Sequence, residues 1–226
     1  LDDSGVELVS SNADDYMMDV VPTPDGKFMI FWMEDAWPAS SLKFTKMDAE
    51  GNLEIGWNPN GNNLSDPSFD SRNLKVKPVN DEAGLLAVWS QDGNFSDIYA
   101  QMLSWDGETL WDEGGIAISE ADNDQVNFSF EFNEDRTSAF ITWEDYRNGT
   151  DFEIFGEVID LELGSSNNQD IQFSSDTTNQ YNPTMALVQD NEFLVVWEDE
   201  RGYYNSDPLL INGVDLYGSG YIIGQG

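Results

Sequence analysis

The stretch Leu85-Leu86-Ala87-Val88-Trp89 is an apolar run that ends in tryptophan, and the chain contains four such runs. The tryptophans recur at intervals of 54 to 57 positions (32 to 89, 89 to 143 and 143 to 197). A fixed period of this length indicates one supersecondary unit that is copied and stacked. The other three runs are Phe28-Met29-Ile30-Phe31-Trp32, Ala139-Phe140-Ile141-Thr142-Trp143 and Phe193-Leu194-Val195-Val196-Trp197.

The second copy shows how the unit divides into strands. Asn73–Val79 alternates apolar and polar residues, which is typical of a half-exposed strand. Leu85–Trp89 is too short for a helix and predicts a strand buried on both faces. Asp97–Leu103 and Gly115–Ser119 are two further apolar segments, and Asp106-Gly107 between them is a tight-turn signal. The unit is therefore expected to have four short strands.

The other copies follow the same template. Their third strands and the turns after them are expected at corresponding positions, and polar linkers rich in Ser, Asp and Asn precede their first strands. The expected third strands are Leu42–Met47, Glu153–Ile159 and Leu210–Val214, with turns at Asp48–Gly51, Asp160–Gly164 and Asp215–Gly218.

Four-stranded units of about 40–50 residues that repeat radially describe the blades of a β-propeller. We therefore expect an all-β chain, with residues 1–226 forming one propeller domain of four-stranded antiparallel blades. The repeats are placed at residues 11–63, 64–119, 120–174 and 175–226. A β-sandwich is the alternative fold, because it also contains many short strands at regular spacing.

The two ends of the chain bear on ring closure. Ser4–Ser10 resembles the fourth strand of the second copy, and the fourth copy stops where its own fourth strand is expected. Residues 1–10 are therefore expected to supply the closing strand of the last blade. A closed four-bladed ring and a four-bladed part of a larger ring both remain open.

The charge of the chain limits its partners. Nine basic and 44 acidic residues give a formal charge of −35, which repels phosphate backbones, so nucleic-acid binding is not expected. No apolar stretch approaches the ~20 residues that span a membrane, so membrane insertion is not expected. The charge has three interpretations: a solvated surface, adaptation to salty water, or binding of divalent cations.

Two residue types are missing altogether. The chain has no His, which removes the commonest general base, and no Cys, which removes thiol nucleophiles and disulfides. Structural zinc sites are therefore not expected either.

Five pieces of the chain share a set of motifs: Asn182-Pro183, Trp143-Glu144-Asp145-Tyr146-Arg147, Trp197-Glu198-Asp199-Glu200-Arg201, Asp97-Ile98-Tyr99-Ala100-Gln101 and Asp106-Gly107-Glu108-Thr109-Leu110-Trp111. These motifs resemble repeats of large secreted proteins from Bacteroidetes-type bacteria, many of which are exported by the type IX secretion system. The resemblance implies propeller-like repeats and a secreted protein or one on the outer bacterial cell surface, with a glycan or protein partner there and a place in a larger surface or secretion complex. The first copy departs from the pattern because Trp32-Met33-Glu34-Asp35-Ala36 lacks the Arg.

The loops after the apolar runs hold the candidate ligand-binding residues. Trp-Glu-Asp-x-Arg places two carboxylates and a guanidinium at a strand exit, where they form a sugar or ion site or pin the loop. Aromatic rings in the same loops stack on sugars or cover the edge of the blade. The candidates are Trp37, Tyr146, Arg147, Arg201, Tyr203 and Tyr204.

Asp-rich loops suggest a Ca²⁺ site. Carboxylate and amide oxygens stand beside glycine turns, as they do in many Ca²⁺ loops, although neither loop matches the EF-hand pattern. Asx turns explain the same residues without a metal. The candidate metal ligands are Asp92, Asn94, Asp97, Asn148 and Asp151.

The sequence favours an extracellular or cell-surface binding module without catalytic activity, which recognises a glycan or a protein through propeller loops. Two alternatives remain: a carboxylate-dependent glycoside hydrolase, and a structural subunit or spacer of a surface assembly. An enzyme is the less favoured interpretation, and no catalytic residue is assigned.

The acidic surplus predicts a stability that depends on salt. Raising NaCl from about 0.02 M to about 0.5 M shortens the Debye length from roughly 20 Å to about 4 Å, so the melting temperature should rise. Thermal melts in NaCl and in CaCl₂ at equal ionic strength test this. An equal rise in both salts indicates screening alone, whereas a further rise in CaCl₂ with heat in calorimetry indicates a Ca²⁺ site.

Overall fold

A computed structural model describes residues 7–166, 170–189, 191–202 and 214–223 of the chain. The chain divides into two compact units, Leu1–Asn94 with Tyr99–Ala117, and Phe95–Ile98 with Ile118–Gly226. Strands dominate both units, and one short 3₁₀-helix, η1, spans Glu200–Gly202. No helix within the described ranges has the length and hydropathy to cross a membrane.

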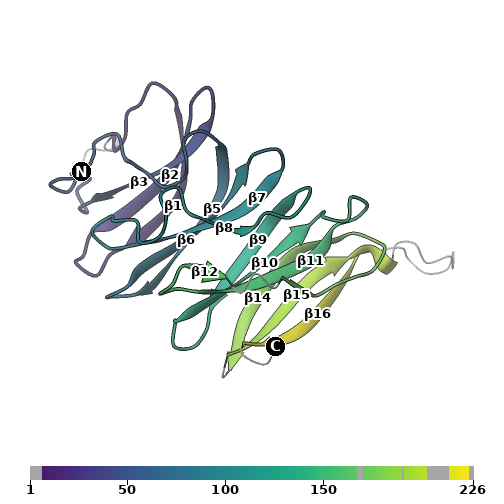
Figure 1. Ribbon diagram of the computed structural model, residues 1–226. Coiled ribbons are helices and arrows are strands. Elements are labelled where there is room, and N and C mark those ends of the chain that lie inside the picture. Colours follow the sequence, from purple (N-terminus) through teal and green to yellow (C-terminus); the bar gives the residue numbers. More distant parts are fainter. Residues whose placement is uncertain (1–6, 167–169, 190, 203–213, 224–226) are drawn as a thin grey trace. The chain divides into compact units, whose positions relative to one another are not determined.

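The strands form four antiparallel sheets, so the all-β prediction is confirmed (Figure 1). Each sheet follows the chain order, and each of the four Trp-ending runs lies in the second strand of its sheet. The sheets are β1(Asp14–Pro22)-β2(Phe28–Asp35)-β3(Ser40–Met47)-β4(Asn62–Asn63), β5(Asp70–Asn80)-β6(Gly84–Asp92)-β7(Ser96–Leu103)-β8(Ile116–Ser119), β9(Gln125–Phe132)-β10(Ser138–Asp145)-β11(Glu153–Asp160)-β12(Ser165–Ser166) with β13(Ile171–Gln172) also on β11, and β14(Gln180–Gln189)-β15(Glu192–Asp199)-β16(Asp215–Ile222).

The second strands carry the core, as the apolar runs predict. Every residue of β6 except the last is buried, and so is every residue of β10 except the first. Such continuous burial requires cover on both faces of the sheet. In β15 the pattern differs: Phe193, Val195 and Trp197 are buried, but Leu194 is exposed. The fourth run is thus buried on one face only, and the prediction of burial on both faces is wrong for that copy.

One rule describes how the sheets stack inside each unit. We name the side of a sheet that carries the repeat tryptophan the Trp face, and the opposite side the back face. In the second unit, Phe140 on the back face of β10 packs against Phe193, Val195 and Trp197 on the Trp face of β15, with the Phe140 and Phe193 ring centroids 5.4 Å apart.

The first unit repeats this arrangement. Met29 and Phe31 on the back face of β2 share a buried cluster with Leu85, Ala87 and Trp89 on the Trp face of β6. In both units the back face of one sheet therefore packs on the Trp face of the next sheet along the chain. Each such contact removes apolar side chains from water, which is the main favourable term in folding.

The fourth copy departs from its predicted strand positions. Asp215–Gly218, expected as a turn, instead begins strand β16, which pairs with β15 from Asp215↔Asp199 to Ile222↔Glu192. Its glycines, Gly218 and Gly220, lie in the strand opposite Val196 and Leu194. The sequence rule that glycine marks turns failed here because glycine also occurs inside strands where another backbone lies close, and a Cβ at Gly218 would lie 3.0 Å from the Val195 carbonyl oxygen.

Two expectations fall partly outside the described residues. Of the expected third strand Leu210–Val214, only Val214 is described, and it precedes β16. Of the expected closing strand, residues 7–10 form no strand, and residues 1–6 are not described. Sheet β14-β15-β16 has no fourth strand among the residues that the structure describes.

Glycines before the fourth strands make room for the tryptophans. Gly115 has φ +88°, and a Cβ there would collide with the Trp89 ring and lie 2.8 Å from the Ala100 carbonyl oxygen. Gly61 stands in the same relation to Trp32 in the first copy. Trp32 and Trp89 therefore each require a residue without a side chain next to the ring.

Replacing Gly115 by Ala tests this requirement. We expect a loss of about 3 kcal/mol of unfolding free energy in urea, because the positive φ and the collision with Trp89 act together. Gly26→Ala is the matched control, since Gly26 has φ +78° but open space around its Cβ position. The control should lose about 1 kcal/mol, and equal losses in both variants would contradict the packing role.

Candidate functional site

Most residues that could bind a ligand or take part in catalysis lie at one edge of each sheet. Antiparallel pairing places the end of the second strand beside the start of the first, as in Asp35↔Asp14, Asp145↔Gln125 and Asp199↔Gln180. The loops that leave the second strands and the linkers that enter the first strands therefore meet at this edge. Most of the predicted site residues lie there.

The Trp-Glu-Asp-x-Arg motif of the third copy forms a closed set of contacts. The fully buried Asp145 accepts a 2.7 Å hydrogen bond from Trp143 Nε1. It also accepts two from Arg147, at 2.8 Å from Nε and 2.6 Å from Nη2. The guanidinium lies 4.0 Å from the centre of the Phe155 ring and pairs with Asp170 at 2.6 Å. Such a fork holds both partners in one geometry.

The fourth copy repeats the same set. Asp199 accepts hydrogen bonds from Trp197 Nε1 and from both arms of Arg201, which lies 4.0 Å from the centre of the Tyr217 ring. Burial raises the pKa of Asp199, but the hydrogen bonds from Arg201 and Trp197 outweigh it, so the pKa lies below its ordinary value. These contacts agree with the interpretation that the arginines pin their loops.

Glu144 is the other carboxylate of the motif, and it points to the back face. Its Oε2 accepts a 3.0 Å bond from Asn127 Nδ2, and its Oε1 a 2.7 Å bond from the Asn182 amide. Burial raises the pKa of Glu144, and the nearby Glu198 raises it further. The hydrogen bonds from Asn182 and Asn127 lower the pKa, but burial outweighs them. Because the side chain is almost fully buried, Glu144 joins two sheets rather than facing a substrate.

Asn127 and Asn182 also mark a shared backbone feature. Both have positive φ, 49° and 52°, and both lie where the register between the first and second strands shifts. Asn73, with φ 56°, occupies the same place in β5. Asparagine tolerates this conformation better than most residues, so the three copies bulge at the same point.

Asp97 is a half-exposed carboxyl with a strongly shifted pKa. It lies at the start of β7, near Glu120 and Asp124 of the linker between β8 and β9. The pKa of Asp97 is raised to about 6, mainly by burial and further by repulsion from Glu120 and Asp124. Asp124 Oδ1 accepts a 3.0 Å bond from the Ser96 amide, which fixes the linker against the strand.

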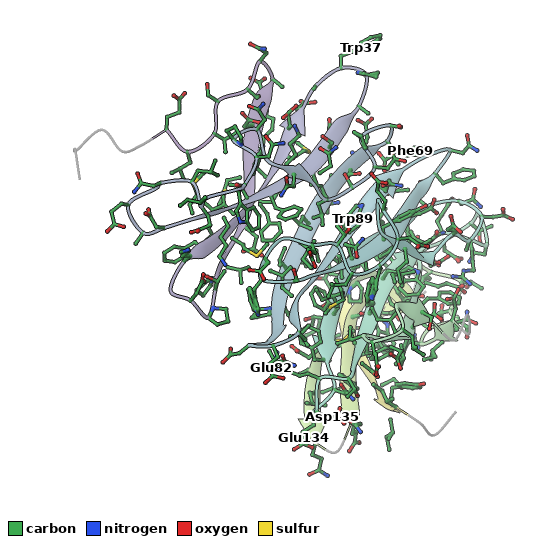
Figure 2. The ribbon with its side chains drawn as sticks, turned by 60° about the vertical axis from the view of Figure 1, so that its left-hand side comes forward. Trp37, Phe69, Glu82, Trp89, Glu134 and Asp135 are labelled. Atoms are coloured by element: carbon green, nitrogen blue, oxygen red, sulfur yellow. The ribbon has the colours of Figure 1, made fainter. Side chains whose placement is uncertain are left out.

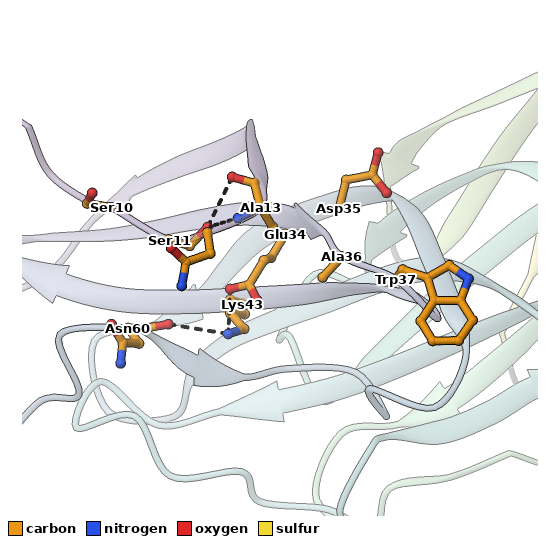
Figure 3. Close-up of a pocket in the computed structure, with 10 residues that line it drawn as sticks. Ser10, Ser11, Ala13, Glu34, Asp35, Ala36, Trp37, Lys43 and Asn60 are labelled. Atoms are coloured by element: carbon orange, nitrogen blue, oxygen red, sulfur yellow. Dashed lines mark hydrogen bonds and ion pairs between the residues drawn. The ribbon is translucent and has the colours of Figure 1, made fainter.

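A cleft of about 610 Å³ opens at the same edge of the first sheet (Figure 3). Lys43 Nζ lies in it, 2.6 Å from Glu34 Oε2 and 3.5 Å from the Asn60 carbonyl oxygen. Trp37 lines one end and is 95% exposed. The cleft is mostly polar, and its lining is Ser10, Ser11, Asn12, Ala13, Glu34, Asp35, Ala36, Trp37, Lys43 and Asn60.

The predicted aromatic residues have different surroundings. Trp37 projects from its loop, whereas Trp89 is buried between sheets (Figure 2). Tyr146 is half-buried, with its ring 4.9 Å from that of Phe152. Tyr203 and Tyr204 lie outside the described residues. Trp37 is therefore the predicted aromatic residue whose ring the structure shows free to stack on a ligand.

The predicted metal ligands do not gather into one cluster. Within the described ranges, no group of three or more acidic side chains is arranged to hold a metal ion. Asn148 Oδ1 accepts bonds from the amides of Thr150 and Asp151, and Asn148 Nδ2 donates to Asp151, as in an Asx turn. The remaining predicted ligands are Asp92, which pairs with Arg72, Asn94, which is exposed, and Asp97.

Comparisons with known proteins bear on the fold. No protein-family profile matches the sequence, and no curated protein sequence matches it. Among solved structures, the chain resembles an α-L-arabinanase of Penicillium chrysogenum complexed with arabinobiose, with a TM-score of 0.54 and 14% identity over 92% of this chain and 62% of that one.

Two further structures are similar. The GH93 α-L-arabinofuranosidase of Fusarium graminearum with arabinobiose has a TM-score of 0.50 and 14% identity, over 94% of this chain and 64% of that one. A protein of unknown function from Dyadobacter fermentans has a TM-score of 0.52 and 12% identity, over 89% of this chain and 51% of that one. The chain thus spans less than two thirds of the length of each.

These likenesses confirm a propeller-like fold and correct the leading functional interpretation. Two of the three structures are glycoside hydrolases, so the expectation of a binding module without catalytic activity is overturned as the leading interpretation. The alternative drawn from the sequence, a carboxylate-dependent glycoside hydrolase, is better supported. At 12–14% identity the likeness itself concerns the fold.

Sequence reasoning missed part of what the structure brings together. Glu120 and Asp124 lie more than 20 positions after Asp97, and Glu34 and Lys43 belong to different strands. The signal available for Asp97 was its place between a polar loop and the apolar Ile98, which predicts partial burial of a carboxyl. With 44 acidic residues, that signal does not stand out.

Asp145→Asn tests whether the Arg fork supports the fold. The change leaves the guanidinium of Arg147 without its buried charge partner, so we expect a loss of about 3 kcal/mol in urea unfolding. Asp81→Asn removes a charge from an exposed turn and should change stability by about 0.5 kcal/mol or less. Equal effects of the two changes would show that the fork adds nothing beyond a surface charge.

Proposed function

We propose that this chain is the propeller of a glycoside hydrolase, with Asp97 as the proton donor. The group formed by Asp97, Glu120 and Asp124, named here the acidic triad, is the reaction centre. Arabinose-containing glycans are the first substrate class to test, because two solved structures of similar fold are an arabinanase and an arabinofuranosidase, each with arabinobiose.

Hydrolysis of a glycosidic bond needs two carboxyl groups in different protonation states. One carboxylic acid protonates the leaving oxygen, and one carboxylate activates water or attacks the sugar. A raised pKa in one member of a pair assigns the roles, because the protonated member is the acid. In the acidic triad, Asp97 is the acid, and Glu120 or Asp124 supplies the carboxylate.

The single observation that carries the proposal is the pKa of about 6 at a half-exposed carboxyl. Exposure separates Asp97 from Glu144, whose pKa is also raised but whose side chain is almost fully buried. A proton donor must reach the substrate, so burial removes Glu144 and leaves Asp97. The lack of His throughout the chain agrees with chemistry based on carboxylates.

The proposal also covers the setting of the enzyme. The repeat motifs and the acidic surface support an exported protein, secreted or held at the outer bacterial surface, where polysaccharides are available as substrates. Each sheet then acts as one blade whose loops gather at one edge of that sheet. Trp37 offers a ring for sugar stacking in the cleft of the first sheet.

Asp97→Asn tests the proton donor. Release of nitrophenol from 4-nitrophenyl α-L-arabinofuranoside, and of sugars from linear arabinan, should fall by about 10²- to 10⁴-fold. In the parent protein the rate should decline as pH rises above about 6, because Asp97 then loses the proton that it must donate. Asp151→Asn, in another loop, is the matched control and should keep full activity.

Stability measurements separate the catalytic role from a folding defect. The folded state raises the pKa of Asp97 above its unfolded value, so ionisation of Asp97 opposes folding as pH rises from about 4 to about 6. Asp97→Asn should therefore gain stability over the parent through that window, by about 1 kcal/mol, since solvent screens the half-exposed group. Unchanged activity in this variant would overturn the role of Asp97, and no turnover by the parent on either substrate would overturn arabinose specificity.

A further inference from the structure

Three aromatic rings form a row at the loop edge of the second unit. The ring centroids of Tyr146 and Phe152 are 4.9 Å apart, and those of Phe152 and Tyr181 are 6.0 Å apart. Tyr146 lies in the loop after β10, Phe152 directly before β11, and Tyr181 at the start of β14, so two sheets contribute. All three residues are partly exposed. We name these three residues the aromatic row.

Hydrogen bonds of the main chain hold the aromatic row in place. The Tyr146 amide donates to the Asp124 carbonyl oxygen at 2.9 Å. The Phe152 amide donates to Asn179 Oδ1 at 3.1 Å, and the Phe152 carbonyl oxygen accepts a 2.8 Å bond from the Gln180 amide. Because the backbone is already fixed, the rings lose little conformational freedom when a ligand binds.

The aromatic row does not follow the repeat. The other three copies carry a carboxylate at the position of Tyr146, three residues after the repeat tryptophan. Those residues are Asp35, Asp92 and Glu200. At the position of Phe152, defined by the pairing with the second strand, the first copy has Ser40 and the fourth has Val214. The packing of the repeat therefore does not require the row.

Asp124 links the aromatic row to the acidic triad. Its side chain accepts a 3.0 Å bond from the Ser96 amide, directly before Asp97, and its carbonyl oxygen accepts the bond from Tyr146. The first ring of the row is therefore anchored to the same linker residue as the strand of the proposed proton donor. A glycan chain that leaves the triad along this linker meets the row first at Tyr146.

The geometry and charge of the row restrict its ligand. The carbon–hydrogen face of a sugar is apolar, so it stacks on aromatic side chains. Neighbouring rings are inclined by 42° and 48°, which suits a single chain that turns between sugar units and not the flat surface of a crystalline polysaccharide. Carboxylates flank the row, with Asp151 before Phe152 and Glu198 paired with Tyr181, so an anionic chain is repelled.

We propose that the aromatic row binds successive units of one neutral glycan chain that extends from the acidic triad. This inference rests on the proposed function for the end of the chain that is cleaved. It assigns an extended chain, rather than a short glycoside, as the substrate class. Binding along the row itself requires the rings and not the proton of Asp97.

Affinity electrophoresis of the Asp97→Asn chain tests binding without consuming the polymer. In native gels that contain linear arabinan, arabinoxylan or galactan, at least one polymer should retard the protein, and polygalacturonate should not. Tyr146→Leu and Tyr181→Leu keep apolar bulk but remove a flat ring, so each should raise the Kd by about 10-fold. Tyr181→Phe keeps the ring and should preserve the Kd.

Phe69→Leu is the matched control, because Phe69 is 41% exposed in the other unit, and its Kd should not change. Microcrystalline cellulose should leave the protein in the supernatant. The proposal is overturned if no neutral polymer retards the protein, if both Leu variants bind as tightly as the Asp97→Asn chain alone, or if cellulose removes the protein from solution.

Hydrolysis separates the aromatic row from the acidic triad. With Asp97 intact, Tyr181→Leu should raise the KM for linear arabinan by about 10-fold. It should leave kcat/KM unchanged for 4-nitrophenyl α-L-arabinofuranoside, whose single sugar occupies the triad alone. Retardation without turnover would support the row and overturn the hydrolase. Equal losses on both substrates would overturn the row and leave the hydrolase standing.

Discussion

The packing of one sheet's back face on the next sheet's Trp face is the contact on which the rest of the structure depends. A short sheet cannot bury both of its faces alone, so each copy needs a neighbour. Trp89 and Trp197 lie in the two buried clusters that form this contact, and the size of the repeat tryptophan restricts its neighbours. Gly61 and Gly115 lack a side chain because Trp32 and Trp89 occupy the space. Asp145 and Asp199 are buried because they accept the indole N–H of Trp143 and Trp197. In the first two copies, Trp32 and Trp89 have no such partner for the indole N–H.

The local sequence pattern predicted where the strands lie, but not which faces of the strands are buried. The runs that became β6 and β10 carry their own signal, since a five-residue, largely apolar run between polar loops is too short for a helix and favours a buried strand. The run Phe193–Trp197 has the same signal, and yet Leu194 is exposed. Burial of a second face depends on what lies beyond the sheet, which no local pattern contains. Asp215–Gly218 failed for a different reason: Gly218 indicated a turn, although the segment begins strand β16.

The candidate site also has one part that the sequence predicted and one part that only the folded structure shows. Trp143, Asp145 and Arg147 are neighbours in sequence, and the structure brings them together at one strand exit, where the Arg completes the loop. The acidic triad joins Asp97, at the start of β7, to the linker that follows β8, so the sequence alone gave no reason to group the three carboxyls. A shifted pKa arises from burial and neighbours, both of which are products of folding.

The large negative charge of the chain affects both the protonation of the acidic triad and the kinds of molecule that can approach it. A neutral glycan approaches a surface of −35 without electrostatic cost, whereas nucleic acids and anionic membranes are repelled. The same excess of carboxylates opposes one more negative charge, which is why Glu120 and Asp124 add to burial in keeping a proton on Asp97. Salt that stabilises the fold by screening also weakens this repulsion. The protonation of the site is thus coupled to ionic strength through the property that decides which ligands reach it.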